Sequence, residues 1–161
     1  MIIRDAVIED IEELAGIYNW AVANTTASFD INVQSLESRR QWFNGYGGKY
    51  PLLVAETDGK IIGYTSLSKF REKEGFFRTV ELSVYIHPDY HGRGAGKALM
   101  KEVIERARSL EHHVIMACIT AGNDISVGMH ERLGFEFCGR IRHAGYKFEQ
   151  WQDLLLYQLI L

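Results

Sequence analysis

The sequence has few of the residues that cross-link or interrupt a fold. Its 161 residues include only two cysteines, Cys118 and Cys138, and two prolines. The cysteines stand far apart and form no CxxC pair, which argues against a disulfide scaffold and a zinc framework. Cys118 lies in the apolar stretch HVIMACIT and is predicted to be a core residue. We therefore expect a protein of the reducing cytoplasm, without a structural metal.

An excess of one charge and long apolar runs are also missing. The chain has 18 Lys and Arg against 21 Asp and Glu, a formal net charge of -3, which argues against a nucleic-acid partner. No window approaches the roughly 18 apolar residues of a membrane span, and the N-terminus MIIRDAVIED lacks the pattern of a signal peptide. With no linker or repeat, we expect one domain over residues 1–161, with neither nucleic acid nor membrane as a partner.

Hydrophobic periodicity predicts an α+β fold with the element order β-α-α-β-β-β-α-β-α-β-β. Asp10 is the expected N-cap of the first helix, and Asp58-Gly59 the turn of a hairpin. The expected strands cover about residues 2–4, 52–57, 60–68, 78–87, 113–120, 137–143 and 152–161, and the expected helices about residues 10–22, 35–44, 95–108 and 123–133. Three consecutive strands with short connections indicate a largely antiparallel sheet.

A glycine-rich turn, His91-Gly92-Arg93-Gly94-Ala95-Gly96-Lys97, joins a predicted strand to a predicted helix. Free backbone N–H groups and the positive helix end can bind a phosphate at such a turn. A Walker A loop needs Gly at position 91 and Ser or Thr at position 98, and the sequence has neither. The dinucleotide fingerprint GxGxxG also fails, because neither pair of glycines has its third glycine.

The turn instead resembles the pyrophosphate loop Q/R-x-x-G-x-G/A of the GNAT superfamily of acyltransferases, with His91 at the first position. TVELSVYIHPDYHGRGAGKALM, ITAGNDISVGMHERLGF and AGYKFEQWQDLLLYQ are similar to stretches of the phosphinothricin and methionine-sulfone N-acetyltransferases within that superfamily. The opening IRDAVIEDIEELAGIYNWAV matches as well. The resemblance implies a GNAT-like fold, with a mixed, mostly antiparallel central sheet flanked by about four helices. It also implies acetylation of the α-amino group of a small amino acid by acetyl-CoA.

The same resemblance implies which residues bind acetyl-CoA. The backbone of Val84, Tyr85 and Ile86 would bind the pantetheine arm, and the N–H groups around Tyr85 would polarise the thioester carbonyl. The pyrophosphate would bind Gly92, Arg93, Gly94, Ala95, Gly96 and Lys97. In the motif N-x-x-S-x-x-x-H, Asn123 would hydrogen-bond the pantetheine with Ser126 nearby. Asn123 is also a helix N-cap candidate, and both roles stay open.

Two residues are candidates for proton transfer. Glu81 lies in the apolar strand VELSVYI, where a carboxylate either faces solvent or lies in a functional cleft. The resembling family has Glu at the matching position, which implies that Glu81 is the general base. We expect Glu81 to act through a water molecule. His130 follows Asn123 by nearly two helical turns and falls on about the same face. A helical His is often structural, but the resembling branch has His here, which implies proton exchange with the CoA thiolate or the amine.

An amino-acid substrate needs a partner for its carboxylate, and arginine offers a bidentate fork. Arg71 stands where the resembling enzymes carry a basic residue that meets the substrate. The weaker substrate candidates are Lys73, Phe76, Arg78 and Phe29. The segment 26–29 is expected to fold over the same mouth as a lid.

Other interpretations stay open. The acceptor can be another amine, such as a peptide N-terminus, a polyamine or an aminoglycoside, although no acidic cluster suits a polycation. A non-catalytic acyl-CoA sensor would need the glycine turn and Asn123 but not Glu81 and His130. His87 and His91 do not share a helical face because Pro88 lies between them, so we expect no metal site. A homodimer through the aromatic C-terminal strand is a further alternative.

Overall fold

Seven strands and four α-helices make up the computed structural model, which describes residues 1–161. The strands are β1 (Ile2–Asp5), β2 (Leu52–Thr57), β3 (Lys60–Lys69), β4 (Thr79–Ile86), β5 (Val114–Thr120), β6 (Glu136–Lys147) and β7 (Gln150–Ile160). The helices are α1 (Ile11–Asn24), α2 (Leu36–Phe43), α3 (Ala95–Ser109) and α4 (Asp124–Arg132), with short 3-10 turns η1 (Ile8–Asp10), η2 (Glu74–Phe76) and η3 (Pro88–Tyr90).

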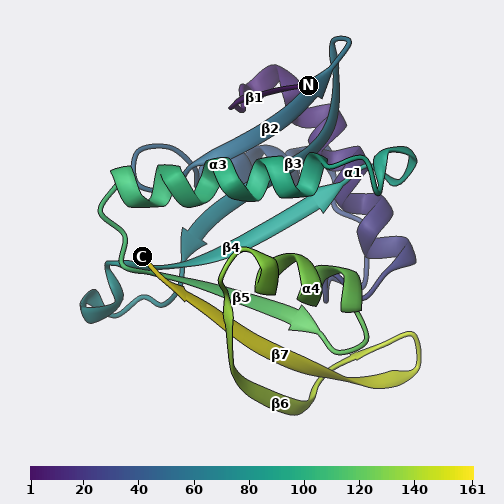
Figure 1. Cartoon of the computed structure of the whole chain (residues 1–161). Helices are drawn as coiled ribbons and strands as arrows, with labels where there is room; N and C mark the ends of the chain where they lie inside the picture. Colours follow the sequence, from purple (N-terminus) through teal and green to yellow (C-terminus); the bar gives the residue numbers. More distant parts are fainter.

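All seven strands belong to one sheet, in the order β1-β2-β3-β4-β5-β7-β6. Only the central pair β4 and β5 is parallel, and every other neighbouring pair is antiparallel. The predicted mixed, mostly antiparallel sheet is therefore confirmed. Figure 1 shows that β4 and β5 start close together and diverge toward their C-terminal ends.

Helices cover both faces of this sheet, and α1 and α3 do so with an apolar stripe. In α3, Leu99, Val103 and Ala107 recur at helical spacing and are fully buried against the strands. On the opposite face, Leu14 and Ile17 of α1 pack into a second, smaller core with residues of β2 and β3. Figure 1 shows α3 crossing the sheet on one side and α1 lying behind it. None of these helices combines the length and the apolar composition that a transmembrane segment requires.

The last two strands are longer than the sequence predicted. β6 and β7 extend to a tight turn at Phe148 and Glu149, which both have positive φ angles. Two register shifts interrupt their ladder, between Phe137 and Gly139 and between Ile141 and Gly145. Such bulges break the alternation of side chains, which is why the pattern of β6 did not indicate its full length.

Asp10 occupies the N-cap position of α1, but its carboxylate makes no capping hydrogen bond to that helix. It accepts instead from the N–H of Val7 at 2.9 Å and pairs with the Arg4 guanidinium at 2.8 Å. Arg4 also pairs with Glu56 of β2 at 2.8 Å. The predicted capping role of Asp10 is therefore wrong. Asp10 instead belongs to an ion-pair network that connects the start of α1 to β1 and β2.

Candidate active site

The sheet opens between its two central strands. Register pairs between β4 and β5 run from Thr79 with Val114 to Leu82 with Ala117, and none follows. On its other side β4 stays paired with β3 up to Ile86, and β5 stays paired with β7 up to Thr120. The ends of β4 and β5 therefore border a wedge, with backbone groups of one edge of β4 left unpaired (Figure 1).

The antiparallel ladder with β3 decides which backbone groups of β4 face this wedge. The N–H of His87 donates to the carbonyl oxygen of Ile62 at 2.9 Å, so alternate residues back along β4 also bond to β3. The N–H and C=O of Val84, and the N–H of Ile86, point the other way. The carbonyl oxygen of Ile86 lies 2.9 Å from Nε2 of His91. Val84 and the N–H of Ile86 are thus the free groups at the wedge.

This geometry corrects the expected role of the Tyr85 backbone. Tyr85 is the register partner of Tyr64 in β3. Its carbonyl oxygen lies 3.0 Å from the place that a Cβ on Gly63 would occupy, on the β3 side of the strand. The backbone of Tyr85 is therefore directed away from the wedge, and neither a pantetheine amide nor a thioester carbonyl placed there meets it. Its side chain lies in a pocket described below.

The glycine turn ends at the N-terminus of α3. Gly92 and Gly94 have φ angles of +73° and +87°, in the left-handed region that favours glycine. Gly96 packs closely against α4, since a Cβ there would lie 3.2 Å from Sδ of Met129. The N–H groups of Ala95, Gly96 and Lys97 have no acceptor within the chain. With the positive end of the helix dipole, they suit a phosphate at this turn.

Asn123 caps α4, as the sequence predicted. Its side-chain oxygen accepts from the N–H of Ser126 at 3.2 Å. This bond leaves the Nδ2 amide of Asn123 without a partner in the chain, so the cap does not consume the donor that a pantetheine carbonyl needs. Both proposed roles of Asn123 are geometrically compatible.

His130 is 3% exposed and lies one turn after Ser126 in α4. Its Nδ1 lies 2.8 Å from the carbonyl oxygen of Ser126. Because a carbonyl only accepts, Nδ1 carries the proton and Nε2 carries a lone pair. Burial lowers the pKa of His130, which keeps the ring neutral. The neutral imidazole can therefore accept a hydrogen bond or a proton at Nε2, but it is not a protonated imidazolium that could act as a general acid.

Glu81 is half-buried in β4, on the face that also carries Ser83 and Tyr85. It lies beside Met116 of β5, at the start of the wedge. Cys118 is also on this face and is half-buried, so its predicted place in the core is wrong. Burial and the neighbouring Glu81 carboxylate raise the pKa of Cys118 to about 12. The thiol therefore stays protonated at neutral pH and is not a nucleophile. It can donate a hydrogen bond to the neighbouring Glu81 carboxylate.

The predicted substrate residues do not all come together. Arg71 follows β3 and donates to the carbonyl oxygen of Phe70 at 3.3 Å, and its charge acts on the pKa of Cys118 beside Glu81. Lys73 is exposed, and Phe76 is 40% exposed and packs edge-on against Phe70. Arg78 does not belong to this group. Its Nε donates to the carbonyl oxygen of Glu111 at 2.7 Å, at the other end of β4 from the wedge, so its predicted role is corrected to a structural one.

The segment 25–35 crosses the open ends of the strands and is tied to three of them. Thr120 of β5 donates to the carbonyl oxygen of Thr26 at 2.6 Å, and Lys147 of β6 donates to that of Ser28 at 2.7 Å. Tyr85 donates to the carbonyl oxygen of Ala27 at 3.4 Å. The ring of Phe29 packs directly on Gly145, where a Cβ would lie 2.4 Å from it. The expected lid is thus a fastened strap, with Phe29 turned toward β6.

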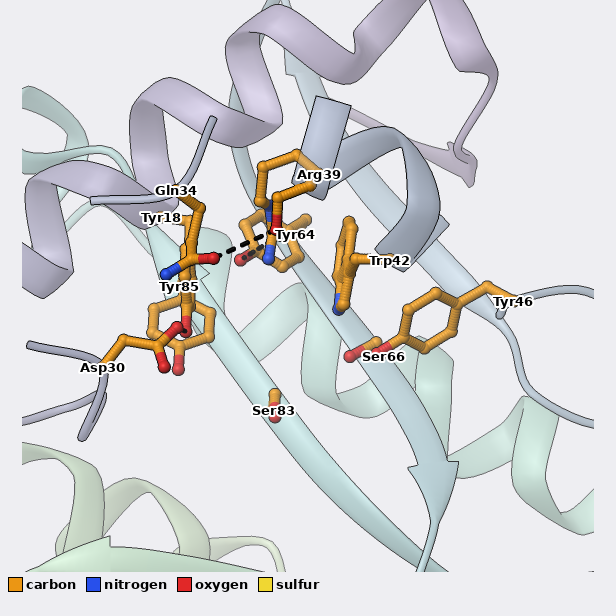
Figure 2. Close-up of a pocket in the computed structure, with 11 residues that line it drawn as sticks. Tyr18, Asp30, Gln34, Arg39, Trp42, Tyr46, Tyr64, Ser66, Ser83 and Tyr85 are labelled. Carbon is orange, nitrogen blue, oxygen red and sulfur yellow. Dashed lines mark hydrogen bonds between the residues drawn. The ribbon is translucent and has the colours of Figure 1, made fainter. Parts of the chain in front are cut away.

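A pocket of about 260 Å³ lies on the Glu81 face of the sheet, between the strands and α1 and α2 (Figure 2). It is lined by Tyr18, Asp30, Gln34, Ser38, Arg39, Trp42, Tyr46, Tyr64, Ser66, Ser83 and Tyr85. Burial raises the pKa of Tyr18, Tyr64 and Tyr85, so these hydroxyls keep their protons. Arg39 was not among the residues that the sequence indicated as functional. The signal available was that Arg39 precedes Trp42 by three residues, which puts both on one face of α2.

No three His, Cys, Asp or Glu side chains are grouped as metal ligands. The site instead consists of a backbone wedge, a helix end with free N–H groups, a buried neutral imidazole and a carboxylate next to a hydroxyl-rich pocket. These parts suit the transfer of an acyl group from a phosphate-bearing donor held in extended form to a small acceptor.

Comparison with known proteins agrees with this geometry. The model of the acetyltransferase (GNAT) family matches residues 14–135. The chain is 44% identical to an L-methionine sulfoximine/L-methionine sulfone acetyltransferase of Pseudomonas paraeruginosa, over 98% of this chain and 92% of that protein. A crystal structure named ribosomal-protein-alanine N-acetyltransferase, from Brucella melitensis, has a TM-score of 0.97 and 44% identity, and covers 100% of both chains.

A second solved structure holds a donor. It is a GNAT superfamily phosphinothricin acetyltransferase from Sinorhizobium meliloti in complex with AcCoA. It is 33% identical with a TM-score of 0.96, and the alignment covers 99% of this chain and 88% of that one.

Proposed function

The chain belongs to the acetyltransferase (GNAT) family and is an acetyl-CoA-dependent N-acetyltransferase, and we propose that it acetylates the α-amino group of small amino acids with a tetrahedral polar head. Methionine sulfone, methionine sulfoximine and phosphinothricin are acceptors of this kind. The proposal is supported by the names of the relatives and by the pocket of amino-acid size on the Glu81 face.

The residues of this chain fit acetyl-CoA. The free C=O of Val84 and the N–H of Ile86 would pair with the pantetheine amides as an added strand would. The N–H groups of Ala95, Gly96 and Lys97 would bind the pyrophosphate, with Gly92, Arg93 and Gly94 shaping the turn. Asn123 would donate from Nδ2, with Ser126 beside it. When bound, acetyl-CoA supplies an activated acetyl thioester.

Glu81 would receive the proton that the acceptor amine must lose. A free amino acid carries an ammonium group at neutral pH, which cannot attack a carbonyl. Glu81 stands two residues before Ser83 of the pocket, on the same face of β4, and next to the strand end where the wedge begins. We expect the proton to pass through a water molecule, since a carboxylate on a strand reaches only a short way into the pocket.

A backbone N–H at the wedge and His130 would serve the rest of the reaction. The N–H of Val84, which is nearer to Glu81 along β4 than that of Ile86, would donate to the carbonyl oxygen on which negative charge develops. The neutral His130 would accept a hydrogen bond at Nε2 and so take part in moving a proton near the thiol end of the donor. Arg71 would pair with the acceptor carboxylate from the loop beside Cys118.

The observation that carries the proposal is the position of Glu81 between the wedge and the pocket. Its place on β4, beside the last register pair with β5 and two residues before Ser83 of the pocket, supports a carboxylate near the point where a donor in the wedge and an acceptor in the pocket would meet. A non-catalytic sensor needs the wedge and the glycine turn but has no use for a carboxylate there. An acceptor at a peptide N-terminus is the second candidate, favoured by the name of the Brucella melitensis structure.

Release of CoA thiol with a panel of acceptors tests the proposal. The panel contains methionine sulfone, methionine sulfoximine, phosphinothricin, a polyamine, an aminoglycoside and a short peptide that begins with alanine. Turnover of the tetrahedral-headed amino acids, with the N-acetyl product identified by mass, is the expected result. Turnover of the peptide alone would move the acceptor to protein N-termini, and binding of acetyl-CoA without turnover of any amine would favour the sensor.

Two further features support proposals on the setting of the enzyme. Both cysteines are free, which suits a cytoplasmic single-domain protein over residues 1–161. Large aromatic side chains of β6, β7 and their turn are exposed, namely Phe137, Tyr146, Phe148 and Trp151. A homodimer through this surface is proposed, and sedimentation equilibrium of the wild type and a Trp151→Ser variant would test it.

A further inference from the structure

The hydroxyl-rich pocket contains a buried cation without an ionic partner. Arg39 of α2 is 4% exposed, and its guanidinium lies 3.6 Å from the ring centre of Trp42 and 4.2 Å from that of Tyr18. It takes part in none of the ion pairs of the chain. Its Nε is fully buried and has no hydrogen-bond acceptor. Its only side-chain hydrogen bond is a long one, 3.4 Å from Nη2 to the hydroxyl of Tyr64.

An arrangement of this kind is unusual for a purely structural arginine. A buried charge normally has a carboxylate partner, because desolvation costs free energy that only pairing or hydrogen bonding offsets. Stacking between two aromatic rings holds the plane of the guanidinium in place and leaves its edge as the donor surface. Figure 2 shows Arg39 above the pocket, between Tyr18 and Trp42.

Several donors in the rest of the pocket are also free of partners within the chain. The hydroxyls of Ser66, Ser83 and Tyr46 make no hydrogen bond within the chain, and neither does the indole N–H of Trp42. Asp30 is the only carboxylate at the pocket, and it accepts from the hydroxyl of Tyr18. Arg39 and the indole of Trp42 can only donate, and the hydroxyls can donate as well, so an acceptor group on a ligand matches them all, with apolar atoms against the aromatic rings.

The pocket is also at the right distance from the reaction. Ser83 is part of the pocket and follows Glu81 by two residues on the same strand, which places their Cα atoms roughly 6.6 Å apart. An α-amine near Glu81 and a head group two methylenes away span a similar length. An acceptor of this shape can therefore reach both places at once.

We infer that the pocket under Arg39 binds the oxygen-bearing head of the acceptor side chain, with Arg39, Ser66 and Ser83 donating to its oxygens. This assignment rests on the proposed function and names the residue that sets its specificity. It separates the two polar ends of the acceptor, with the carboxylate at Arg71 and the head at Arg39. An acceptor without oxygen on its head, such as methionine itself, leaves the Arg39 donor unmatched and binds more weakly.

Calorimetric titration of the enzyme loaded with CoA tests the inference directly. Methionine sulfone and methionine are titrated into the wild type, Arg39→Met, Ser66→Ala and the control Arg40→Met, whose arginine is the exposed neighbour of Arg39 in α2. We expect the wild type to bind methionine sulfone at least about tenfold more tightly than methionine. Arg39→Met should remove that preference, Ser66→Ala should reduce it about threefold, and Arg40→Met should keep it.

Equal weakening of both ligands in Arg39→Met would overturn the inference, as would a wild type that binds them equally or binds neither. If Arg39→Met does not fold, as judged from its near-ultraviolet circular dichroism, the inference is tested by the ratio of the affinities of Ser66→Ala for methionine sulfone and methionine. Thiol release on the same variants separates this inference from the proposed function. An Arg39-dependent preference in binding without turnover overturns the acetylation of these acceptors and supports the head-group site. If Arg39→Met acetylates methionine sulfone with the same preference over methionine as the wild type does, the acetylation of these acceptors is supported and the head-group site is overturned.

Discussion

Nδ1 of His130 lies 2.8 Å from the carbonyl oxygen of Ser126, one turn earlier in the same helix. The bond fixes the tautomer, and burial lowers the pKa of the ring. The lone pair at Nε2 is therefore present at neutral pH, without a proton that would first have to leave. His130 differs in this respect from a surface histidine, which is partly charged at the same pH.

The lowered pKa of His130 makes the stability of the fold depend on pH. At pH below the ordinary value of about 6.5, the unfolded chain binds a proton at this residue that the folded chain resists. The free energy of unfolding should therefore rise from pH 5 to pH 7. His130→Asn should flatten this rise, and His113→Asn, at an exposed position, should leave it unchanged. Urea unfolding at pH 5, 6 and 7 measures the three slopes. An identical slope in wild type and His130→Asn would refute the buried neutral ring.

Glu81→Gln should lower kcat by about 100-fold, because the variant cannot accept the proton of the acceptor amine. KM for acetyl-CoA should stay within about twofold, since Glu81 is on the face of β4 that carries the pocket and the wedge binds through backbone groups. Steady-state kinetics with methionine sulfone measures both constants. Glu102→Gln, on the exposed surface of α3, is the matched control. Equal losses in kcat and in affinity for acetyl-CoA would contradict this division of roles.

Gly94→Ala should weaken acetyl-CoA binding by about tenfold or more. A Cβ at Gly94 meets no atom of the chain, but the φ angle of +87° strains any other residue by about 1–2 kcal/mol and shifts the N–H groups at the start of α3. Gly16→Ala, in α1 and with equal space, should leave binding unchanged. Fluorescence titration with CoA compares the two. Wild-type affinity in Gly94→Ala would show that the left-handed turn is not needed.

Lys147→Met should loosen the strap over residues 25–35. The buried Lys147 donates to the carbonyl oxygen of Ser28, and loss of a charged hydrogen bond costs about 1.5–3 kcal/mol. Limited proteolysis should cut the variant within residues 25–35 sooner than the wild type. Lys101→Met, exposed on α3, should be cut like the wild type. Unchanged protection in Lys147→Met would mean that Thr120 and Tyr85 hold the strap without it.

Periodicity and glycine chemistry were enough to predict the elements and the glycine turn at the start of α3. The apolar stripe of α3 and the turn at Asp58-Gly59 are local signals, and the structure has both where the sequence placed them. The cap by Asn123 is local as well. These features depend on neighbours within one or two turns of chain, so a single sequence contains them.

The features that the sequence did not predict depend on pairing between distant segments. The direction of the Tyr85 backbone follows from its register with Tyr64, and the burial of Arg39 follows from the packing of α2 on the sheet. Arg78 donates to the carbonyl oxygen of Glu111, which is 33 residues away in the sequence. Each of these positions has an ordinary local pattern, and its role is set by what lies across from it.

A crystal structure of Glu81→Gln with acetyl-CoA and methionine sulfone tests the central claim most directly. We expect the pantetheine arm between β4 and β5 on the backbone of Val84 and Ile86, and the α-amine beside residue 81 with the sulfone oxygens at Arg39. Acetyl-CoA bound outside the wedge, or an acceptor bound away from the Glu81 face of the sheet, would contradict it.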